Sequence, residues 1–225
     1  MTYKTRSIVL HKALFKESSF LVKLMTEDFG IISAIAQGAR KNKSRFFSHF
    51  EVGNCLEIVF LSKNNSNLYT ITDSSLFHCS DIENITYKQL ISIQCVLELY
   101  NQLIITEDES KDFYALLLTF LDYIPTVKSN HLLVIWRFLF RLTELLGFPI
   151  DTSTLSPIPY PLSPKKWFDI LPHTAKYINE ANILDETCLI INKMILDWFE
   201  SHLNKKLHCK AMKIYEEELR VDTIL

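Results

Sequence analysis

The chain has 225 residues, of which 48% are apolar and 22% are charged, and its formal net charge is −2. This composition is close to that of ordinary globular proteins and excludes disorder along the whole chain. The length suffices for one large domain or two small ones, either of which can bury a core.

The distribution of charge along the chain is less even than its sum. Residues 1–80 hold ten Lys or Arg and six Asp or Glu, a balance of +4, whereas residues 81–225 hold fourteen and twenty, a balance of −6. A basic first part followed by an acidic second part predicts two domains with different partners.

Cysteine spacing and hydropathy indicate the compartment. The five cysteines are odd in number and the nearest two lie sixteen positions apart, so no disulfide framework is visible. The first fifteen residues lack the uninterrupted apolar core of a signal peptide, and no apolar stretch reaches the ~18 residues that a membrane span needs. We therefore expect a soluble cytoplasmic protein that makes no membrane contact.

Five segments in the first eighty residues have the pattern of short β-strands. They are rich in Val, Ile, Leu and Phe, and turn residues separate them. The segments cover residues 7–15, 18–26, 30–38, 54–62 and 68–73. The sequence TEDFG between the second and the third is typical of a tight hairpin. Five short strands suffice to close a small barrel, which removes exposed sheet edges.

After Ser80 the apolar residues recur every three or four positions, which predicts helices. The first has Thr86 as a candidate N-cap, Pro125 ends the second, and Gly147 follows the third as a left-handed residue. The predicted helices cover residues 86–104, 110–124, 130–146, 185–203 and 210–219. The third is apolar on nearly all sides, so we expect it at the centre of a bundle.

These patterns predict an α+β fold with two domains. A five-stranded β-barrel is expected over residues 1–80, and an all-helical domain over residues 81–225. Residues 149–172 hold six of the seven prolines and predict a loop within the helical domain.

The stretch AQGARKNKSRF, residues 36–46, holds four cations and no acid: Arg40, Lys41, Lys43 and Arg45. The simplest interpretation is a solvated loop. The alternative is a contact with nucleic-acid phosphates, because each Lys or Arg that neutralises a phosphate releases a counterion. A five-stranded barrel with a basic face is the arrangement of the OB-fold, a common single-strand binder, and this favours the second interpretation.

Three aromatic residues follow the basic stretch, namely Phe46, Phe47 and Phe50. Exposed aromatic rings can stack on bases. We expect at least two of the three to belong to the core instead.

The first fifty residues also contain a recognisable series of motifs. Glu17 precedes Ser18, a strand ends at Thr26, and Gly30 centres a hairpin; Gly38-Ala39-Arg40 then precedes Lys43-Ser44. This series resembles the amino-terminus of the RecO family of DNA repair and recombination proteins. Residues 97–124 and 138–151 are similar to the helices of that family, more loosely.

The resemblance implies an OB-fold domain followed by a helical domain, and a non-enzymatic role. Proteins of this family bind single- and double-stranded DNA and anneal complementary strands. With their partner RecR they help load the recombinase RecA onto DNA coated by single-stranded-DNA-binding protein. The resemblance also implies that the helical domain binds the acidic, Phe-terminated C-terminal tail of that coating protein.

One feature departs from the family. Many members carry a four-cysteine zinc motif after the third helix, whereas this chain has no cysteine between Cys95 and Cys188. Zinc is held by closely spaced ligand pairs. We therefore expect no metal and no other cofactor, with the proline-rich loop in place of the motif.

The third predicted helix carries Arg137, Arg141 and Glu144 on one face. The simplest interpretation is an internal ion pair between Arg141 and Glu144. The alternative is that Arg137 and Arg141 accept the acidic tail, because guanidinium groups pair well with carboxylates.

Signatures of catalysis are missing from the sequence. Only four glycines are present, and their spacing matches neither a phosphate-binding loop nor a dinucleotide-binding fingerprint. The SPKK stretch matches only the bare spacing of some acyl enzymes. We predict a DNA-binding recombination mediator that is not an enzyme. Two alternatives stay open: an RNA-binding OB-fold factor, and a protein-interaction scaffold that binds no nucleic acid.

The residues expected to hold DNA are all cationic and lie in the barrel domain. They are Arg40, Lys41, Lys43 and Arg45, with help from Arg6, Lys12 and Lys23.

Overall fold

The structure is a computed structural model. It describes residues 1–41, 43–46, 48–62, 68–78, 85–104, 111–150, 185–203 and 206–222. The chain divides into two compact units, Met1–Ile82 with Leu103–Leu121, and Glu83–Gln102 with Asp122–Leu225. The predicted boundary between residues 80 and 81, and the predicted proline-rich loop from residue 151 onward, lie outside the described residues.

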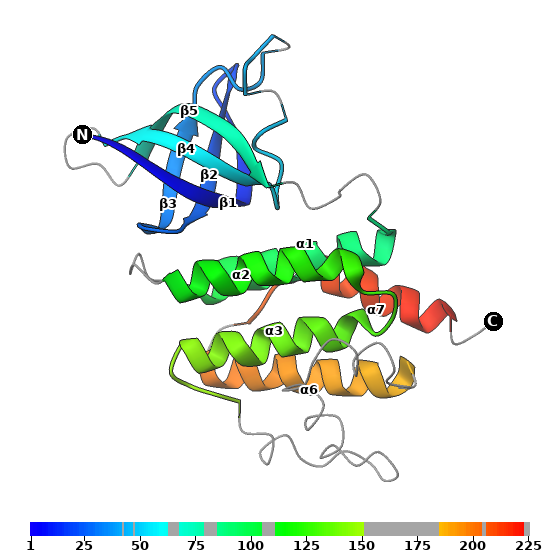
Figure 1. The fold of residues 1–225 in the computed structure, drawn as a ribbon. Helices are drawn as coiled ribbons and strands as arrows, with labels where there is room; N and C mark the ends of the chain where they lie inside the picture. The colour runs from blue at the N-terminus through cyan, green and yellow to red at the C-terminus, as the bar shows by residue number, and fades with distance from the viewer. Residues whose placement is uncertain are drawn as a thin grey trace. The chain divides into compact units, whose positions relative to one another are not determined.

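The first unit contains a closed barrel of five strands (Figure 1). The strands are β1 (Thr2–Phe15), β2 (Ser19–Thr26), β3 (Gly30–Ala36), β4 (Cys55–Leu61) and β5 (Leu68–His78). Their order around the barrel is β1-β2-β3-β5-β4, and only the β3–β5 pair is parallel among the strand pairs of this barrel. This confirms the predicted five-stranded OB-fold barrel followed by helices.

Strand β1 closes the barrel because it pairs with two neighbours. Its first half pairs with β4, from Thr2 to Ile8, and its second half pairs with β2, from Ser7 to Phe15. The register shifts at a bulge between Val9 and His11. A bulge bends and twists a strand, which lets one strand leave one partner and join another.

The barrel interior follows from the two-residue alternation of its strands. Side chains at alternate positions are buried, as in Leu56, Ile58 and Phe60 of β4. Phe46 and Phe50, from the connection between β3 and β4, pack into the same core. The predicted hairpin between β2 and β3 is present: the Thr26 hydroxyl donates to the carbonyl of Gly30 at 2.7 Å.

Five α-helices and one 3-10 turn are described after the barrel (Figure 1). They are α1 (Tyr87–Leu103), α2 (Lys111–Tyr123), η2 (Ile124–Thr126), α3 (His131–Leu145), α6 (Asp185–Leu203) and α7 (Lys210–Asp222). All five predicted helices are confirmed. No helix in the described ranges is long and apolar enough to cross a bilayer.

The sequence signals at the helix ends act as predicted. The Thr86 hydroxyl accepts the backbone N–H of Gln89 at 3.3 Å, and the Gln89 side chain accepts the N–H of Thr86 at 2.8 Å, which forms a capping box. Gly147 has φ +81° and ends α3. The backbone N–H of Gly147 donates to the carbonyl of Glu144, and the backbone N–H of Phe148 donates to the carbonyl of Thr143. This is the pattern of a Schellman motif.

Helix α3 is buried at ten of its fifteen positions, as expected for a central helix. The ring of Phe138 packs near that of Tyr100 of α1, with centroids 6.1 Å apart. At the start of α7, the Glu98 carboxylate of α1 accepts the backbone N–H of Lys210 at 2.6 Å. An acid placed at a helix N-terminus satisfies free N–H groups and complements the helix dipole.

Candidate nucleic-acid interface

The basic stretch lies in the connection between β3 and β4, and Arg40 fixes the start of this connection. The Arg40 guanidinium donates to the backbone carbonyls of Lys16 at 3.2 Å and Glu17 at 3.0 Å. The backbone N–H of Arg40 donates to the carbonyl of Ser18 at 3.0 Å. The β3–β4 connection is therefore attached to the β1–β2 turn at the same end of the barrel.

Lys16 joins this cationic group although the sequence analysis did not select it. It is exposed and occupies the β1–β2 turn with φ +52°. In a β1-β2-β3 meander, the turn after β1 lies beside the end of β3. That topology was the signal that would have placed Lys16 next to Arg40.

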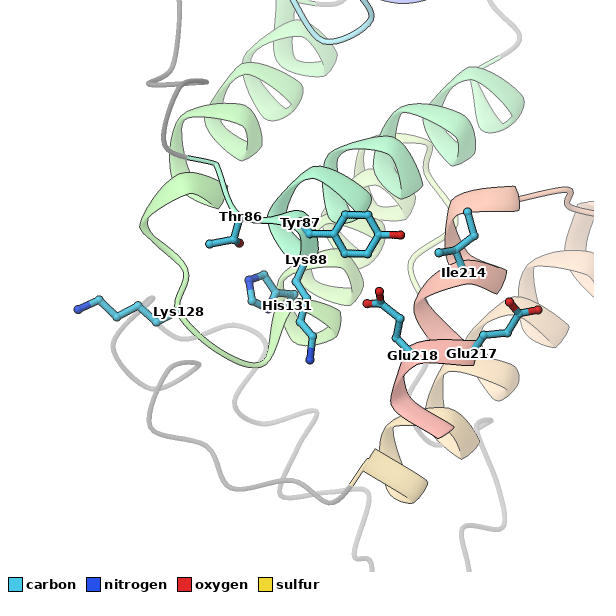
Figure 2. A pocket seen from close by; sticks show the side chains of 8 residues that line it. All are labelled: Thr86, Tyr87, Lys88, Lys128, His131, Ile214, Glu217 and Glu218. Carbon is cyan, nitrogen blue, oxygen red and sulfur yellow. The ribbon is translucent and has the colours of Figure 1, made fainter. Parts of the chain in front are cut away.

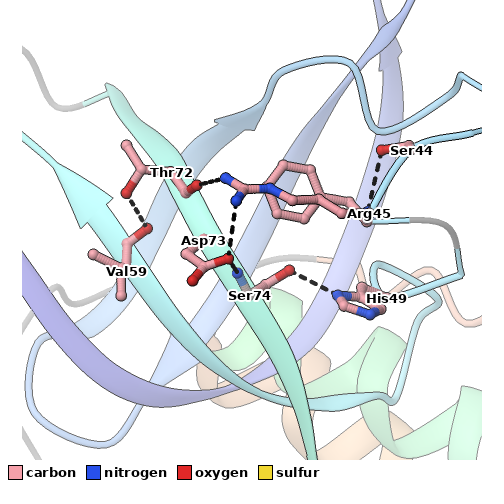
Figure 3. Close-up of polar contacts among 8 residues, drawn as sticks. Ser44, Arg45, His49, Val59, Thr72, Asp73 and Ser74 are labelled. Atoms are coloured by element: carbon pink, nitrogen blue, oxygen red, sulfur yellow. Dashed lines mark hydrogen bonds and ion pairs between the residues drawn. The ribbon is translucent and has the colours of Figure 1, made fainter.

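Arg45 is held on strand β5 (Figure 3). Its guanidinium lies 3.6 Å from the Asp73 carboxylate and donates to the carbonyl of Thr72. The same group lies 4.7 Å from the centroid of the Phe46 ring. The Arg45 side chain remains 67% exposed, so Asp73 and solvent screening reduce the charge that it offers to a ligand.

A second contact attaches the same segment to β5. Nδ1 of His49 lies 2.8 Å from the Ser74 hydroxyl (Figure 3). Beside these contacts is an open hollow of about 380 Å³. Its lining comes from the β3–β4 connection and from β5: Gln37, Ser44, Arg45, Phe46, Thr70, Ile71 and Thr72.

Lys41 and Lys43 differ from the two arginines. Both are exposed, and neither forms an ion pair with any residue that the structure describes. Their positive charges are therefore not neutralised by the described carboxylates of the barrel. Of the four cations in the basic stretch, these two are best placed to meet an external anion.

The three cations proposed as helpers lie on the strands rather than in the connection. The guanidinium of Arg6, in the half of β1 that pairs with β4, lies 4.0 Å from the centroid of the Phe77 ring. Lys12 pairs with the carboxylate of Glu51. Lys23, on β2, is half-buried, and its side chain or backbone interacts with other residues. The structure does not gather these three around the β1–β2 turn.

The aromatic residues of the segment do not form a stacking surface. Phe46 is 6% exposed and Phe50 is 2% exposed, which confirms that at least two of the three phenylalanines belong to the core. Phe47 lies outside the described residues. The described part of this surface is cationic and polar.

The two arginines of α3 have different surroundings. The Arg141 guanidinium donates to the Glu144 carboxylate at 2.7 Å, so the predicted ion pair is present, although both side chains are about half exposed rather than internal. Arg137 is half-buried. Burial raises the pKa of Tyr123, and the charge of Arg137 acts in the opposite direction, which places Arg137 near that phenol.

The described residues offer no metal centre. Across the ranges that the structure covers, no group of three or more His, Cys, Asp or Glu side chains is arranged to hold a metal ion. The described part of the β3–β4 connection offers Lys and Arg side chains, which are suited to pair with anions.

Comparison with known proteins gives consistent matches. Residues 1–79 match the family described as "Recombination protein O N terminal". The DNA repair protein RecO of Chlorobium limicola is 31% identical over 149 residues, which cover 66% of this chain and 57% of that protein. The proteins of the same name from Prosthecochloris aestuarii and Chloroherpeton thalassium are each 28% identical, over 66% and 67% of this chain. The chain thus matches less than two thirds of the length of these relatives, namely 57%, 56% and 58%.

Proposed function

We propose that this chain acts as a RecO-type DNA repair protein, because residues 1–79 match the RecO N-terminal family and the RecO protein of Chlorobium limicola is 31% identical to it. In this proposal it binds single- and double-stranded DNA and mediates recombination during repair. The observation that supports this most directly is the exposure of Lys41 and Lys43 without a described carboxylate partner. They stand beside Arg40 and Lys16 at one end of an OB-fold barrel. Such a surface binds phosphates without reading base sequence.

Sequence-independent phosphate binding suits the annealing of complementary strands. Two strands repel each other through their phosphates, and cations that neutralise these phosphates lower the repulsion. The bases stay free to pair, because Phe46 and Phe50 of the β3–β4 connection are buried and offer no surface for stacking. Annealing and recombinase loading onto coated DNA are the proposed activities, and the proposal includes no enzymatic step.

The proposed protein partners are RecR and the acidic C-terminal tail of single-stranded-DNA-binding protein. For the tail, α3 supplies Arg137 and Arg141, whose guanidinium groups suit carboxylates. Arg141 already pairs with Glu144, so a tail carboxylate has to displace or share that contact. Arg137 is therefore expected to contribute more of the tail affinity than Arg141.

The test of DNA binding is a titration of labelled single-stranded oligonucleotide at low salt. The triple variant Lys41→Ala, Lys43→Ala, Arg45→Ala should lose affinity and show a weaker salt dependence. A matched control removes the same charge from exposed lysines of the second unit, which we call the helical unit: Lys193→Ala, Lys206→Ala, Lys213→Ala. Wild-type affinity in the first variant would remove the β3–β4 connection from the proposal.

The same titration separates the alternatives. Absence of binding by the wild-type chain at low salt would favour the protein-interaction scaffold. Preferential competition by RNA of matched sequence would favour an RNA-binding factor. For the tail, a labelled acidic peptide ending in Phe should bind the Arg137→Ala variant more weakly than the Arg141→Ala variant.

A further inference from the structure

A pocket of about 770 Å³ lies within the second unit, between the N-terminal ends of α1 and α3 and one side of α7 (Figure 2). Its lining residues all belong to that one unit. They are Thr86, Tyr87, Lys88, Lys128, His131, Ile214, Glu217 and Glu218. We call it the His131 pocket. Its volume is in the range of small-molecule sites in proteins.

His131 lines this pocket and carries a buried polar atom without a hydrogen-bond partner among the described residues. The side chain is 5% exposed, and Nε2 has no hydrogen-bond partner among the described residues. The ring also bonds the backbone carbonyl of Val127. Since Nε2 is the unpartnered nitrogen, Nδ1–H is the donor to that carbonyl, and Nε2 is left as a bare acceptor in the neutral ring.

An orphaned buried acceptor at the wall of a cavity indicates a missing partner. Burial lowers the pKa of His131, and the charge of Lys88 lowers it further, so the neutral ring is favoured. A buried polar atom without a hydrogen bond costs free energy, and native proteins leave few of them. Nε2 has almost no exposed surface, so a ligand in the pocket can bring a proton to it only when the ring turns toward the cavity.

The charges around the pocket are divided between its two sides. Lys88 and Lys128 lie at the starts of α1 and α3, and the N-cap residue Asn130 makes no side-chain cap to α3. The positive end of a helix dipole at a helix start favours an anion. Glu217 and Glu218 line the opposite side, on α7. Carboxylates are hydrogen-bond acceptors and suit the donor groups of a ligand.

Apolar surface connects the two sides. Tyr87 is 58% exposed, and Figure 2 shows its ring extending from α1 toward Glu218 and Ile214 of α7. Ile214 is 43% exposed. An exposed tyrosine ring is a surface on which a flat base can stack.

We propose that the His131 pocket binds a nucleoside monophosphate group. The phosphate lies toward Lys88, Lys128 and the start of α3, and shares a proton with His131. The base lies against Tyr87, and its amino group or the sugar hydroxyl donates to Glu217 or Glu218. An isolated phosphate satisfies only one side of the pocket, and an acidic peptide is repelled by the two carboxylates.

Two sources carry this chemical group: a free nucleotide and the 5′-phosphorylated end of a DNA strand. The choice of the strand end rests on the proposed function, whereas the pocket itself does not. The pocket belongs to the second unit, whereas Lys16, Arg40, Lys41 and Lys43 belong to the barrel in the first unit.

The test is calorimetric titration of the full chain with deoxycytidine monophosphate, deoxycytidine and inorganic phosphate. The monophosphate should bind about tenfold more tightly than either fragment, because only it contacts both sides of the pocket. Lys128→Ala should weaken monophosphate binding about fivefold, through loss of one exposed charge contact. The control Lys213→Ala, on α7 but outside this pocket, should leave it unchanged.

The acidic side gives a sharper discrimination. The double variant Glu217→Ala, Glu218→Ala should weaken binding of the monophosphate and strengthen binding of inorganic phosphate, because the substitutions remove the negative charges together with the carboxylate acceptors. Equal effects on both ligands would overturn the proposal. So would the absence of monophosphate binding by the wild-type chain at millimolar concentration, or tighter binding of an acidic peptide than of the nucleotide.

Histidine-selective NMR reports the contact without a core substitution. Deoxycytidine monophosphate should shift the ring signals of His131 and leave those of the exposed His202 and His208 in place. A strand with a 5′-phosphate should do the same, and a strand with a 5′-hydroxyl should not. The triple variant of Lys41, Lys43 and Arg45 should keep the shift, so failure of the pocket and failure of the barrel surface are distinguishable.

Discussion

Asn192 accepts a hydrogen bond from the indole N–H of Trp136 at 3.0 Å, and both side chains are buried. The Asn192 amide in turn donates to the Glu216 carboxylate at 2.7 Å. The first residue lies on α6, the second on α3 and the third on α7. One buried amide therefore links three helices of the second unit, and a buried indole N–H depends on it.

Replacing Asn192 with Ala should lower the free energy of unfolding of the helical unit by about 3 kcal/mol. The change removes two hydrogen bonds and leaves the Trp136 N–H buried without a partner. Urea denaturation followed by tryptophan fluorescence measures the loss. Lys193→Ala, an exposed neighbour on the same helix, should change stability by less than about 0.5 kcal/mol. An equal effect of the two substitutions would show that the hydrogen bonds of Asn192 contribute nothing to the free energy of unfolding.

The elements of the fold were predictable because their signals are local. The alternation in residues 54–62 marks β4, and Thr86 marks the start of α1 through a bond to a residue three positions away. Gly147 ends α3 by its own backbone preference. Each of these signals depends on neighbours within a few positions, which a sequence displays directly.

The sequence predicts the candidate site as a charged stretch, but it does not predict which of the four cations contact the barrel and which lack a described ion pair. Arg40 bonds the carbonyls of Lys16 and Glu17, and Arg45 bonds that of Thr72. Every residue has a backbone carbonyl, so no sequence pattern identifies which one an arginine will find. Long-range strand pairing decides it, so the difference in contacts between the two lysines and the two arginines is visible only in the folded barrel.

Gly147→Ala should destabilise the helical unit by about 1 kcal/mol, although there is space for the methyl group. No atom lies within 4 Å of an added Cβ, so the cost arises from the backbone at φ +81°. Thermal unfolding measures the change. Gly147→Asn should cost less, because Asn tolerates the left-handed region better than Ala. A larger loss for Asn than for Ala would contradict this explanation.

The stability of the helical unit should fall as the pH drops below about 6.5, the ordinary pKa of histidine. Burial, reinforced by Lys88, lowers the pKa of His131 in the fold, and the bond to Val127 opposes this only in part. The unfolded chain then binds a proton more readily than the folded one, so stability rises with pH across this window. Urea midpoints at about pH 7.5 and 5.5 measure the effect. His131→Gln should show a smaller fall, and an unchanged fall would assign it to other groups.

The four cations of the basic stretch should contribute unequally to the salt dependence of DNA binding. Each phosphate contact on single-stranded DNA adds about 0.7 to the slope of log K against log salt concentration. Lys41→Ala with Lys43→Ala should therefore lower the slope by about 1.4, because neither lysine pairs with a described carboxylate. Arg45→Ala should lower it by less than one contact, since Asp73 already lies 3.6 Å from its guanidinium. A full loss of about 0.7 from Arg45→Ala would show that DNA displaces Asp73.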